Sequence, residues 1–528
     1  MLDCYIKNAR ICTGRKEPAR IGNVGIKDQK ISCIHYHSEN FTIPKAIDTI
    51  EAHGFLLTPG FIDPHASTGF GFFFPNAADH KLYQGITTEI FGNCGTSTAP
   101  IGKHLNKTMN RLSGNIGFPF EWRTLSEYFD QVKGNLQFNI ATLVGHSTLR
   151  AGNMDDWHNL TSPQMEVMEK ELSEAMDQGA LGLSTGLIYA PGCFAEMDEI
   201  VALAKIVAEK GGVYASHIRN ERDKVEEAVE EALTIGAKAN IRVLISHVKT
   251  AEKENWGKMS KVLKQLETFN ANSKLQAACD VYPYTAVSTK LRAFIPKHFL
   301  QDGIPAVGEK MKNPSAIPAI AKWIKEKDYE LSRMLVISDD LKLFYNKTIS
   351  EIALEQSLSE AEVVATILTA STEAWVVYHC IDQADIDKAV MWPNSMICTD
   401  SWSYPINAPK SIGQPHPRSY GAFTEYLERY VINEQMLSWE EAIHKITYLP
   451  AEFFQLKNRG LIEEGYAADL VLLDPSKVKA NATYLNPRQL SSGVYHLWVN
   501  GVHLIKNEKI QESTPGKVLT LNEPKEVF

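Results

Sequence analysis

Four side chains of the kind that bind transition metals each follow a short apolar run. Cys94 lies in FGNCG, His217 and His247 end the closely similar segments VYASH and VLISH, and Asp400 ends MICTD. Zinc accepts sulfur, nitrogen and oxygen ligands and, when it is catalytic, keeps one position open for water. The four residues therefore predict a zinc site that activates water for hydrolysis.

A thiol enzyme is the alternative interpretation of Cys94. A cysteine nucleophile needs one histidine as its base. Here two matched histidines and an acidic residue accompany the cysteine, and a metal accounts for the surplus. Each residue taken singly also fits an ordinary buried histidine or cysteine. The metal interpretation therefore depends on all four meeting in space.

The elements that would bring these residues together are predicted strands. Apolar runs separated by helix-length amphipathic segments indicate βα units. Eight such runs lie at residues 60–63, 86–92, 138–145, 180–187, 212–217, 242–247, 275–284 and 395–400. Eight parallel strands with covering helices predict an α/β fold, a (β/α)8 TIM-like barrel rather than an open sheet. His65, which follows the first strand, would then share the C-terminal face of the barrel with the four residues above.

The segments between these strands carry helix signals and one interruption. Residues 162–179, 196–212 and 222–236 are amphipathic and end on glycine, as helices commonly do. Two further apolar runs, 333–338 and 374–379, fit either barrel strands or an insertion. The segment from about 290 to 350 breaks the strand–helix spacing, so we expect a small inserted subdomain there.

Both ends of the chain have the alternating pattern of short strands. We therefore expect residues 1–58 and 450–528 to form one small β-sandwich domain together. Residues 59–449 would form the metallo-hydrolase barrel, with the inserted subdomain inside it.

Composition excludes several classes of partner. A net charge of −9 and a pI near 6.0 disfavour nucleic-acid binding. The first residues alternate instead of forming a secretion signal, and no run approaches the roughly 18 apolar residues of a membrane-spanning helix. Eight cysteines without close pairs indicate reduced thiols. We expect a cytoplasmic protein with a small-molecule substrate and no nucleic-acid or membrane partner; the oligomeric state is left open.

Ten segments resemble, in order and over nearly the whole chain, the D-aminoacylase branch of the amidohydrolase superfamily. They are TPGFIDPHAS, GITTEIFGNCGTSTAP, GHSTLR, ALGLSTGLIYAPG, SHIRNE, SHVK, DVYPYTA, CTDS, HPRSYGAF and KNRGLIEEGYAADLVLLD. The resemblance implies a metal-dependent barrel, a β-sandwich built from both termini and a small domain inserted after the seventh strand. It also implies hydrolysis of N-acyl-D-amino acids.

The resemblance also implies roles for individual residues. Carried over by position, Cys94, His217 and His247 would hold a tightly bound zinc, His65 would be a further metal ligand, and Asp400 would be the catalytic acid and base. Four other positions match residues that contact the substrate carboxylate, namely Lys249, Tyr282, Ser288 and Arg418.

One position departs from the family pattern. The family has His-x-His after the first strand, whereas this chain reads His65-Ala66-Ser67. A neutral serine is a poor zinc ligand. We therefore expect one tightly bound zinc and a second metal site that is weak or absent.

Two other functions are weighed against deacylation. A cyclic-amide hydrolase of the hydantoinase or dihydroorotase type generally bridges two metals with a carboxylated lysine on the fourth strand, but ALGLSTGL has no lysine. A catalytically weakened barrel used for binding is supported directly by Ser67 alone, while Cys94, His217, His247 and Asp400 are all retained. Metal stoichiometry and an amidase assay separate these functions.

Overall fold

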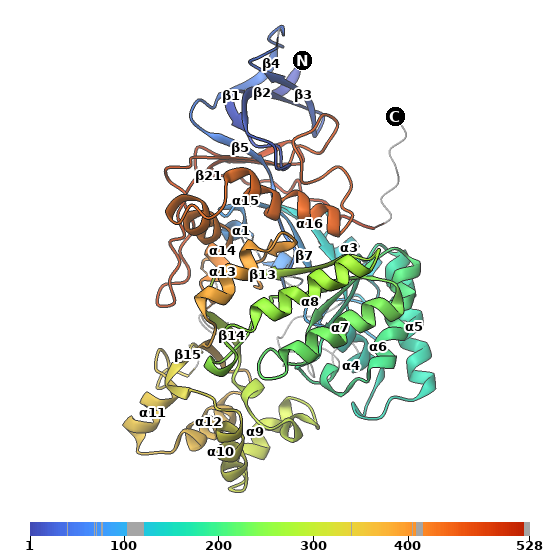
Figure 1. Cartoon of the computed structure of the whole chain (residues 1–528), viewed down its shortest axis with the longest axis vertical. Coiled ribbons are helices and arrows are strands. Elements are labelled where there is room, and N and C mark those ends of the chain that lie inside the picture. The colour runs from blue at the N-terminus through green and yellow to red at the C-terminus, as the bar shows by residue number, and fades with distance from the viewer. Residues whose placement is uncertain are drawn as a thin grey trace.

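The computed structural model describes residues 1–39, 41–67, 69, 71–74, 76, 78–102, 121–338, 341–403, 405–407 and 415–521. Figure 1 shows a β-sheet that contains the N-terminus at one end of the molecule, a central barrel with its helices, and a cluster of helices labelled α9 to α12 at the opposite end.

Eight parallel strands form the central barrel. Their sheets have the orders β6-β7-β8 and β17-β13-β12-β11-β10-β9. The strands β8 and β9 are two pieces of the run predicted at 138–145, and Leu143 between them joins the two sheets. At the other seam the Asp400 N–H donates to the His65 carbonyl at 2.9 Å, and the Ser67 N–H donates to Ser401 at 2.9 Å. The bounds are β6 (Phe61–Asp63), β7 (Ile86–Phe91), β8 (Asn139–Thr142), β9 (Val144–Gly145), β10 (Gly182–Gly186), β11 (Val213–His217), β12 (Arg242–Ile245), β13 (Ala277–Val281) and β17 (Ser395–Ile397). The predicted barrel is confirmed.

Apolar side chains fill the interior of the barrel at the beginnings of the strands. Ala215 of β11, Leu244 of β12 and Ala278 of β13 belong to one buried cluster, together with Phe453. Successive side chains of a strand point to opposite faces. The side chains two positions after Ala215 and Ala278 therefore point into the same interior, one layer nearer the C-terminal strand ends, where a site can form.

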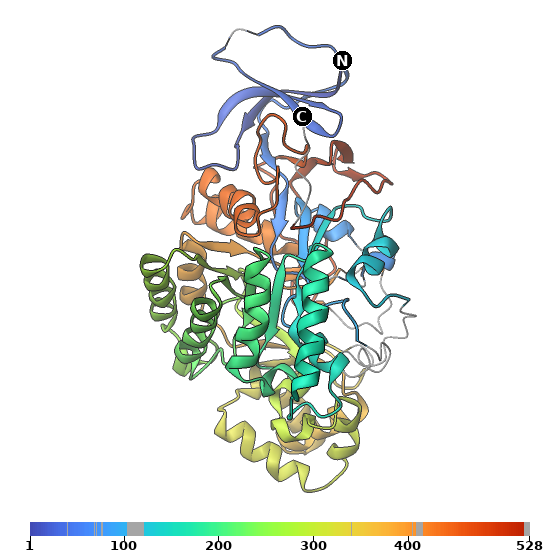
Figure 2. The ribbon, with the colours of Figure 1, turned by 90° about the vertical axis from the view of Figure 1, so that its right-hand side faces the viewer.

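Helices cover the outer face of the barrel, and Figure 2 shows several of them standing side by side. The helices of this region are α1 (Asp79–Leu82), α3 (Leu125–Val132), α4 (His146–Asn153), α5 (Ser162–Asp177), α6 (Met197–Glu209), α7 (Val225–Ala239), α8 (Met259–Asn272), α13 (Gln383–Met391), α14 (Arg418–Leu427), α15 (Trp439–Ile446) and α16 (Tyr448–Phe453).

The prediction that the third of the expected helices ends at Gly236 is wrong. The helix α7 continues to Ala239 and ends where Asn240 takes a left-handed conformation, with φ 55°. A Cβ atom on residue 236 would lie 2.2 Å from Cγ2 of Val243 on β12. Glycine is therefore present because α7 packs closely on β12, and it does not terminate the helix.

A separate sheet follows β13, where the sequence predicts an inserted subdomain. It has the order β14-β16-β15 and is antiparallel, so the apolar runs at 333–338 and 374–379 contribute strands to this sheet and not to the barrel. Its strands lie between Ala286 and His379, with two helices directly before β16; the limits of about 290 and 350 for the subdomain stay a prediction. The elements are β14 (Ala286–Lys290), α9 (Pro305–Met311), α10 (Ala316–Glu326), β15 (Met334–Val336), α11 (Ile349–Gln356), α12 (Glu360–Ala370) and β16 (Trp375–His379).

A nine-stranded sheet combines strands from both ends of the chain. Its order is β21-β20-β19-β18-β5-β1-β2-β3, with β4 paired to β1. The two ends meet where β5 pairs with β18. The division of the chain at residues 58 and 450 stays a prediction. The strands are β1 (Leu2–Ile11), β2 (Arg20–Lys27), β3 (Lys30–Tyr36), β4 (Ala46–Glu51), β5 (Leu56–Pro59), β18 (Leu470–Leu473), β19 (Val494–Val499), β20 (Val502–Lys506) and β21 (Lys509–Ile510).

Within the described ranges, no helix has both the length and the apolar character needed to cross a membrane.

Candidate metal centre

Side chains from four barrel strands converge around Cys94 at the C-terminal strand ends. The Cys94 Sγ atom lies 3.3 Å from His65 Nε2, 3.3 Å from His247 Nε2 and 3.6 Å from His217 Nδ1. The His65 Nε2 atom is in turn 3.6 Å from Asp400 Oδ1. Donor atoms of His65, Cys94, His247 and Asp400 all lie within 4.8 Å of one another. The structure therefore brings together the sulfur, the imidazoles and the carboxylate that the sequence singled out.

The backbone at three of these residues has an uncommon conformation. The φ angles are +52° at Cys94, +34° at His247 and +43° at Asp400. Such angles are unfavourable for residues other than glycine, and they cluster at functional sites where the surrounding structure enforces them. A Cβ atom on Gly95 would lie 2.7 Å from the backbone nitrogen of Gly186. Glycine at 95 therefore lets the Cys94 loop lie directly against the end of β10.

The charge states around Cys94 suit a metal cation. Burial alone would raise the pKa of the Cys94 thiol, but the adjacent His65 and His247 lower it below its usual value. A thiolate is the form of cysteine that binds metals. Burial lowers the pKa of His217 to about 4, so this imidazole is neutral at pH 7 and can act as a ligand. The donor set, with one thiolate and several imidazoles, fits zinc.

Asp400 is held as a carboxylate. Its burial would raise its pKa, but Arg418 and the nearby histidines lower the pKa well below the usual value. The Arg418 Nη2 atom lies 3.0 Å from Asp400 Oδ2, while Oδ1 of the same carboxylate faces His65. Asp400 thus presents one oxygen to the cluster and has the other fixed by a guanidinium.

Lys249 and Glu221 form a charged pair behind His247. The Lys249 Nζ atom lies 2.6 Å from Glu221 Oε1 and 2.7 Å from His247 Nδ1. Glu221 was not among the predicted site residues, although it stands four residues after His217, within SHIRNE. His217, Glu221 and His247 also form a group of closely spaced donor atoms. The Lys249 ammonium lies beside this second group and supplies a positive charge there.

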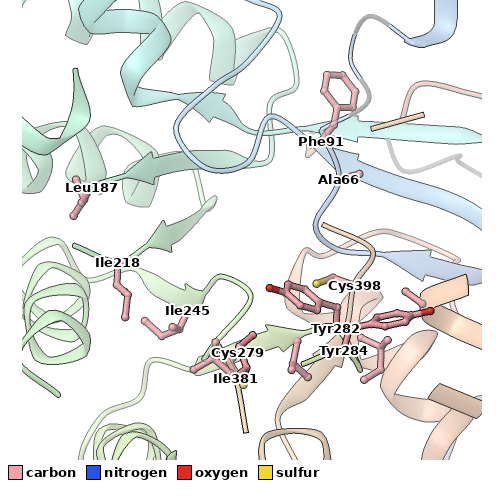
Figure 3. Close-up of a cluster of buried hydrophobic side chains, with 14 of the residues drawn as sticks. Ala66, Phe91, Leu187, Ile218, Ile245, Cys279, Tyr282, Tyr284, Ile381 and Cys398 are labelled. Atoms are coloured by element: carbon pink, nitrogen blue, oxygen red, sulfur yellow. The ribbon is translucent and has the colours of Figure 1, made fainter. Parts of the chain in front are cut away.

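Three of the four residues predicted to contact a substrate carboxylate lie close to one another. The Tyr282 ring centroid lies 4.5 Å from the Arg418 guanidinium and 5.8 Å from Lys249 Nζ. Figure 3 shows Tyr282 among the buried apolar side chains around the strand ends. Its hydroxyl and Arg418 Nε are buried and have no hydrogen-bond partner among the residues that the structure describes. Ser288 lies instead on β14 of the inserted sheet, paired with Val377.

Of two further polar residues at the strand ends, one lies outside the cluster around Cys94 and the other contacts two of its histidines. His146 begins α4, and its Nε2 atom lies 2.8 Å from Glu199 Oε1, outside the donor group around Cys94. Asp280, which was not among the predicted site residues, lies at the end of β13 and contacts both His65 and His247. Its position two residues after the inward-facing Ala278 was the signal that could have identified it.

The model of the amidohydrolase family matches residues 48–305 and 408–505 of this chain. The chain belongs to the amidohydrolase family. Among curated proteins, this amidohydrolase is 32% identical to N-acyl-D-aspartate deacylase and 31% identical to N-acyl-D-glutamate deacylase, both of Alcaligenes xylosoxydans xylosoxydans. The first alignment covers 98% of this chain and 95% of the relative; the second covers 98% and 96%.

Solved structures agree with this assignment. The structure of N-acyl-D-glutamate deacylase from Bordetella bronchiseptica, complexed with zinc and a phosphonate inhibitor, superposes with a TM-score of 0.82 at 28% identity, over 98% of this chain and 99% of the other. A dihydropyrimidinase from Brevibacillus agri NCHU1002 reaches a TM-score of 0.59 at 14% identity, with 98% of each chain covered. The second likeness shows a shared fold alone. The two curated deacylases and the solved N-acyl-D-glutamate deacylase confirm the predicted membership of the D-aminoacylase branch.

Proposed function

We propose that this amidohydrolase hydrolyses the amide bond of N-acyl-D-amino acids and releases a free D-amino acid and a carboxylate. The observation that carries the proposal is the meeting of a thiolate, three imidazoles and a carboxylate at the barrel mouth, with two cations close by. The relatives at about 30% identity over nearly the whole chain support the substrate class, because their names specify N-acyl-D-amino acids.

The metal is zinc in this proposal, with one ion bound tightly by Cys94, His217 and His247. His65 is a further ligand on the side of Asp400, and Ser67 leaves a second metal position weak or absent. One-metal activation and second-metal attenuation are described for D-aminoacylase, a solved relative at 27% identity. That description supports the view that one metal is enough in this fold.

The residues have separate tasks in the reaction. A bound zinc would act as a Lewis acid that activates water and polarises the acyl carbonyl. Asp400 accepts the proton of the attacking water at its carboxylate and returns it to the departing amine. Arg418, Lys249 and Tyr282 bind the substrate carboxylate, with Ser288 contributing from the inserted sheet. The planar guanidinium fork of Arg418 suits a carboxylate.

The cellular location in this proposal is the cytoplasm. All eight cysteines are free thiols, which supports a reducing compartment. The partner is a small-molecule substrate.

Paired D and L substrates test the proposed function. N-acetyl-D-amino acids, including N-acetyl-D-aspartate and N-acetyl-D-glutamate, are assayed for amine release beside their L enantiomers, and zinc is measured on the same sample. We expect about one zinc per chain and a preference for D substrates of at least about 100-fold in kcat/KM, since a misplacement of about 1 Å costs a factor of that size.

Three other results would contradict the proposal. Equal release from both enantiomers would show that the carboxylate contacts do not select configuration. Hydrolysis of hydantoins with two bridged metals would favour a cyclic-amide hydrolase. No release from any substrate, with zinc present, would favour a barrel used for binding.

A further inference from the structure

One buried carboxylate contacts two of the candidate ligands at once. Asp280, at the end of β13, has no exposed surface. Its Oδ2 atom lies 3.2 Å from His65 Nδ1, and its Oδ1 atom accepts a hydrogen bond of 2.7 Å from the His247 N–H. His65 follows β6 and His247 follows β12, so Asp280 connects residues that come from two different parts of the barrel.

We propose that Asp280 is a positioning residue of the metal centre, which sets the orientation and tautomer of His65 and fixes the backbone of His247. This inference rests on the proposed function, because it assumes that both histidines bind the metal. Asp280 does not itself belong to the group of donor atoms around Cys94. It therefore acts through the two histidines.

The effect on His65 follows from the two nitrogens of its ring. A neutral imidazole carries one proton, and the nitrogen that carries it donates to whatever acceptor is adjacent. The carboxylate beside Nδ1 places the proton there, which leaves a lone pair on Nε2. That atom faces Cys94 Sγ and Asp400 Oδ1. Carboxylates commonly fix metal-binding histidines in this way.

The effect on His247 concerns its backbone. With φ at +34°, His247 is in a region that non-glycine residues adopt only when neighbouring contacts hold them there. The hydrogen bond from its N–H to Asp280 is such a contact. It helps to keep the residue in the conformation that directs Nε2 at Cys94.

The first-strand segment makes this positioning more important. Residues 63–67 read Asp-Pro-His-Ala-Ser, so His65 is the single imidazole that this segment offers. A pair of histidines could share the task of facing the metal. With Ser67 in the second place, the contribution of the segment depends on one ring, and the orientation of that ring depends on Asp280.

Replacement of Asp280 by asparagine separates the tautomer effect from simple loss of packing. The amide has nearly the same shape, and its carbonyl oxygen can still accept from the His247 N–H. Its NH2 group, however, would donate to His65 Nδ1 and force the proton onto Nε2, where it blocks metal binding. We expect the zinc affinity of Asp280→Asn to fall about 10- to 100-fold, the usual effect of losing such a partner. Competition with a chelator measures this affinity, and the visible spectrum of the cobalt-substituted protein should change with it.

Asp469→Asn is the matched control. Asp469 is also a buried carboxylate that accepts from a backbone N–H, that of Asn500 at 2.6 Å, and it pairs with Arg459. It has no contact with the metal centre in the described structure, so its replacement should leave zinc affinity and the cobalt spectrum unchanged. A loss in Asp469→Asn equal to that in Asp280→Asn would overturn the proposal.

A double-mutant cycle with His65→Ala tests whether Asp280 acts through His65. In the His65→Ala background, Asp280→Asn should cause little further loss of affinity. A full further loss would contradict the proposal, and so would wild-type affinity in either Asp280→Asn or His65→Ala alone. The His65→Ala measurement is decisive even if Asp280→Asn does not fold.

The failure of this inference can be told from the failure of the proposed function. If the wild-type protein binds zinc and hydrolyses D substrates while Asp280→Asn binds zinc equally well, this inference fails and the proposed function stands. Absence of zinc binding by the wild-type protein would overturn both.

Discussion

Replacing Cys94 by serine is expected to remove the metal and, with it, the amide hydrolase activity. Cys94 is the centre of the cluster, since its sulfur lies within 3.6 Å of nitrogen atoms of three histidines. Serine exchanges a thiolate for a neutral hydroxyl, which is a poor zinc ligand. The fall in zinc affinity should exceed the 10- to 100-fold effect that loss of an outer partner causes. Zinc per chain after dialysis against graded chelator, with activity on the same samples, measures it.

Cys193→Ser is the matched control for this substitution. Cys193 is a half-buried free thiol whose side chain lies outside the donor group. Its replacement should leave zinc content and activity unchanged. Wild-type zinc affinity in Cys94→Ser would show that the sulfur is not a ligand, and a thiol mechanism would then be favoured if the variant were still inactive.

Asp400→Asn is expected to lower kcat by about 10²- to 10⁴-fold, the range typical for loss of a general acid and base. Arg418 keeps Asp400 ionised, so the carboxylate can accept a proton throughout the neutral range. Asparagine keeps the shape but cannot take up or return that proton. Zinc content should be retained, because Cys94, His217 and His247 remain. Steady-state kinetics on an N-acyl-D-amino acid, with metal analysis, measures both quantities.

The same Asp469→Asn variant is the control here, as a buried carboxylate without contact to the described centre. It should retain the wild-type kcat. A rate for Asp400→Asn within a few-fold of wild type would remove Asp400 from the proton transfer. A loss of zinc equal to the loss of rate would instead make Asp400 chiefly a metal ligand.

The barrel strands were predictable because their pattern is local. Strands buried on both faces appear as nearly continuous apolar runs, and each of the eight runs contains a barrel strand. The places of the candidate ligands at the strand ends were predictable for the same reason, since each follows such a run. Gly236 misled the prediction because glycine is both a helix terminator and a residue that permits close packing. Only the position of Val243 on the neighbouring strand distinguishes the two uses.

The outer partners of the ligands were not predictable from local pattern. Asp280 stands inside the run LQAACDVYPY and contacts a histidine 215 positions earlier in the chain. Glu221 contacts Lys249, which follows a different strand. The first pairing depends on the closed barrel, which brings the end of β13 near that of the non-adjacent strand β6, and the second depends on β11 and β12 lying side by side in the sheet. The pairing of β16 with β14 across the intervening helices is likewise not visible in the local pattern.

Zinc K-edge X-ray absorption on the wild-type protein as purified would show directly whether a cysteine sulfur binds the metal. We expect a mixed shell, with sulfur at about 2.3 Å and nitrogen or oxygen at about 2.0–2.2 Å from the metal. The sulfur distance should belong to one ligand, Cys94. A shell of nitrogen and oxygen alone, in protein that carries stoichiometric zinc, would show that Cys94 is not a zinc ligand.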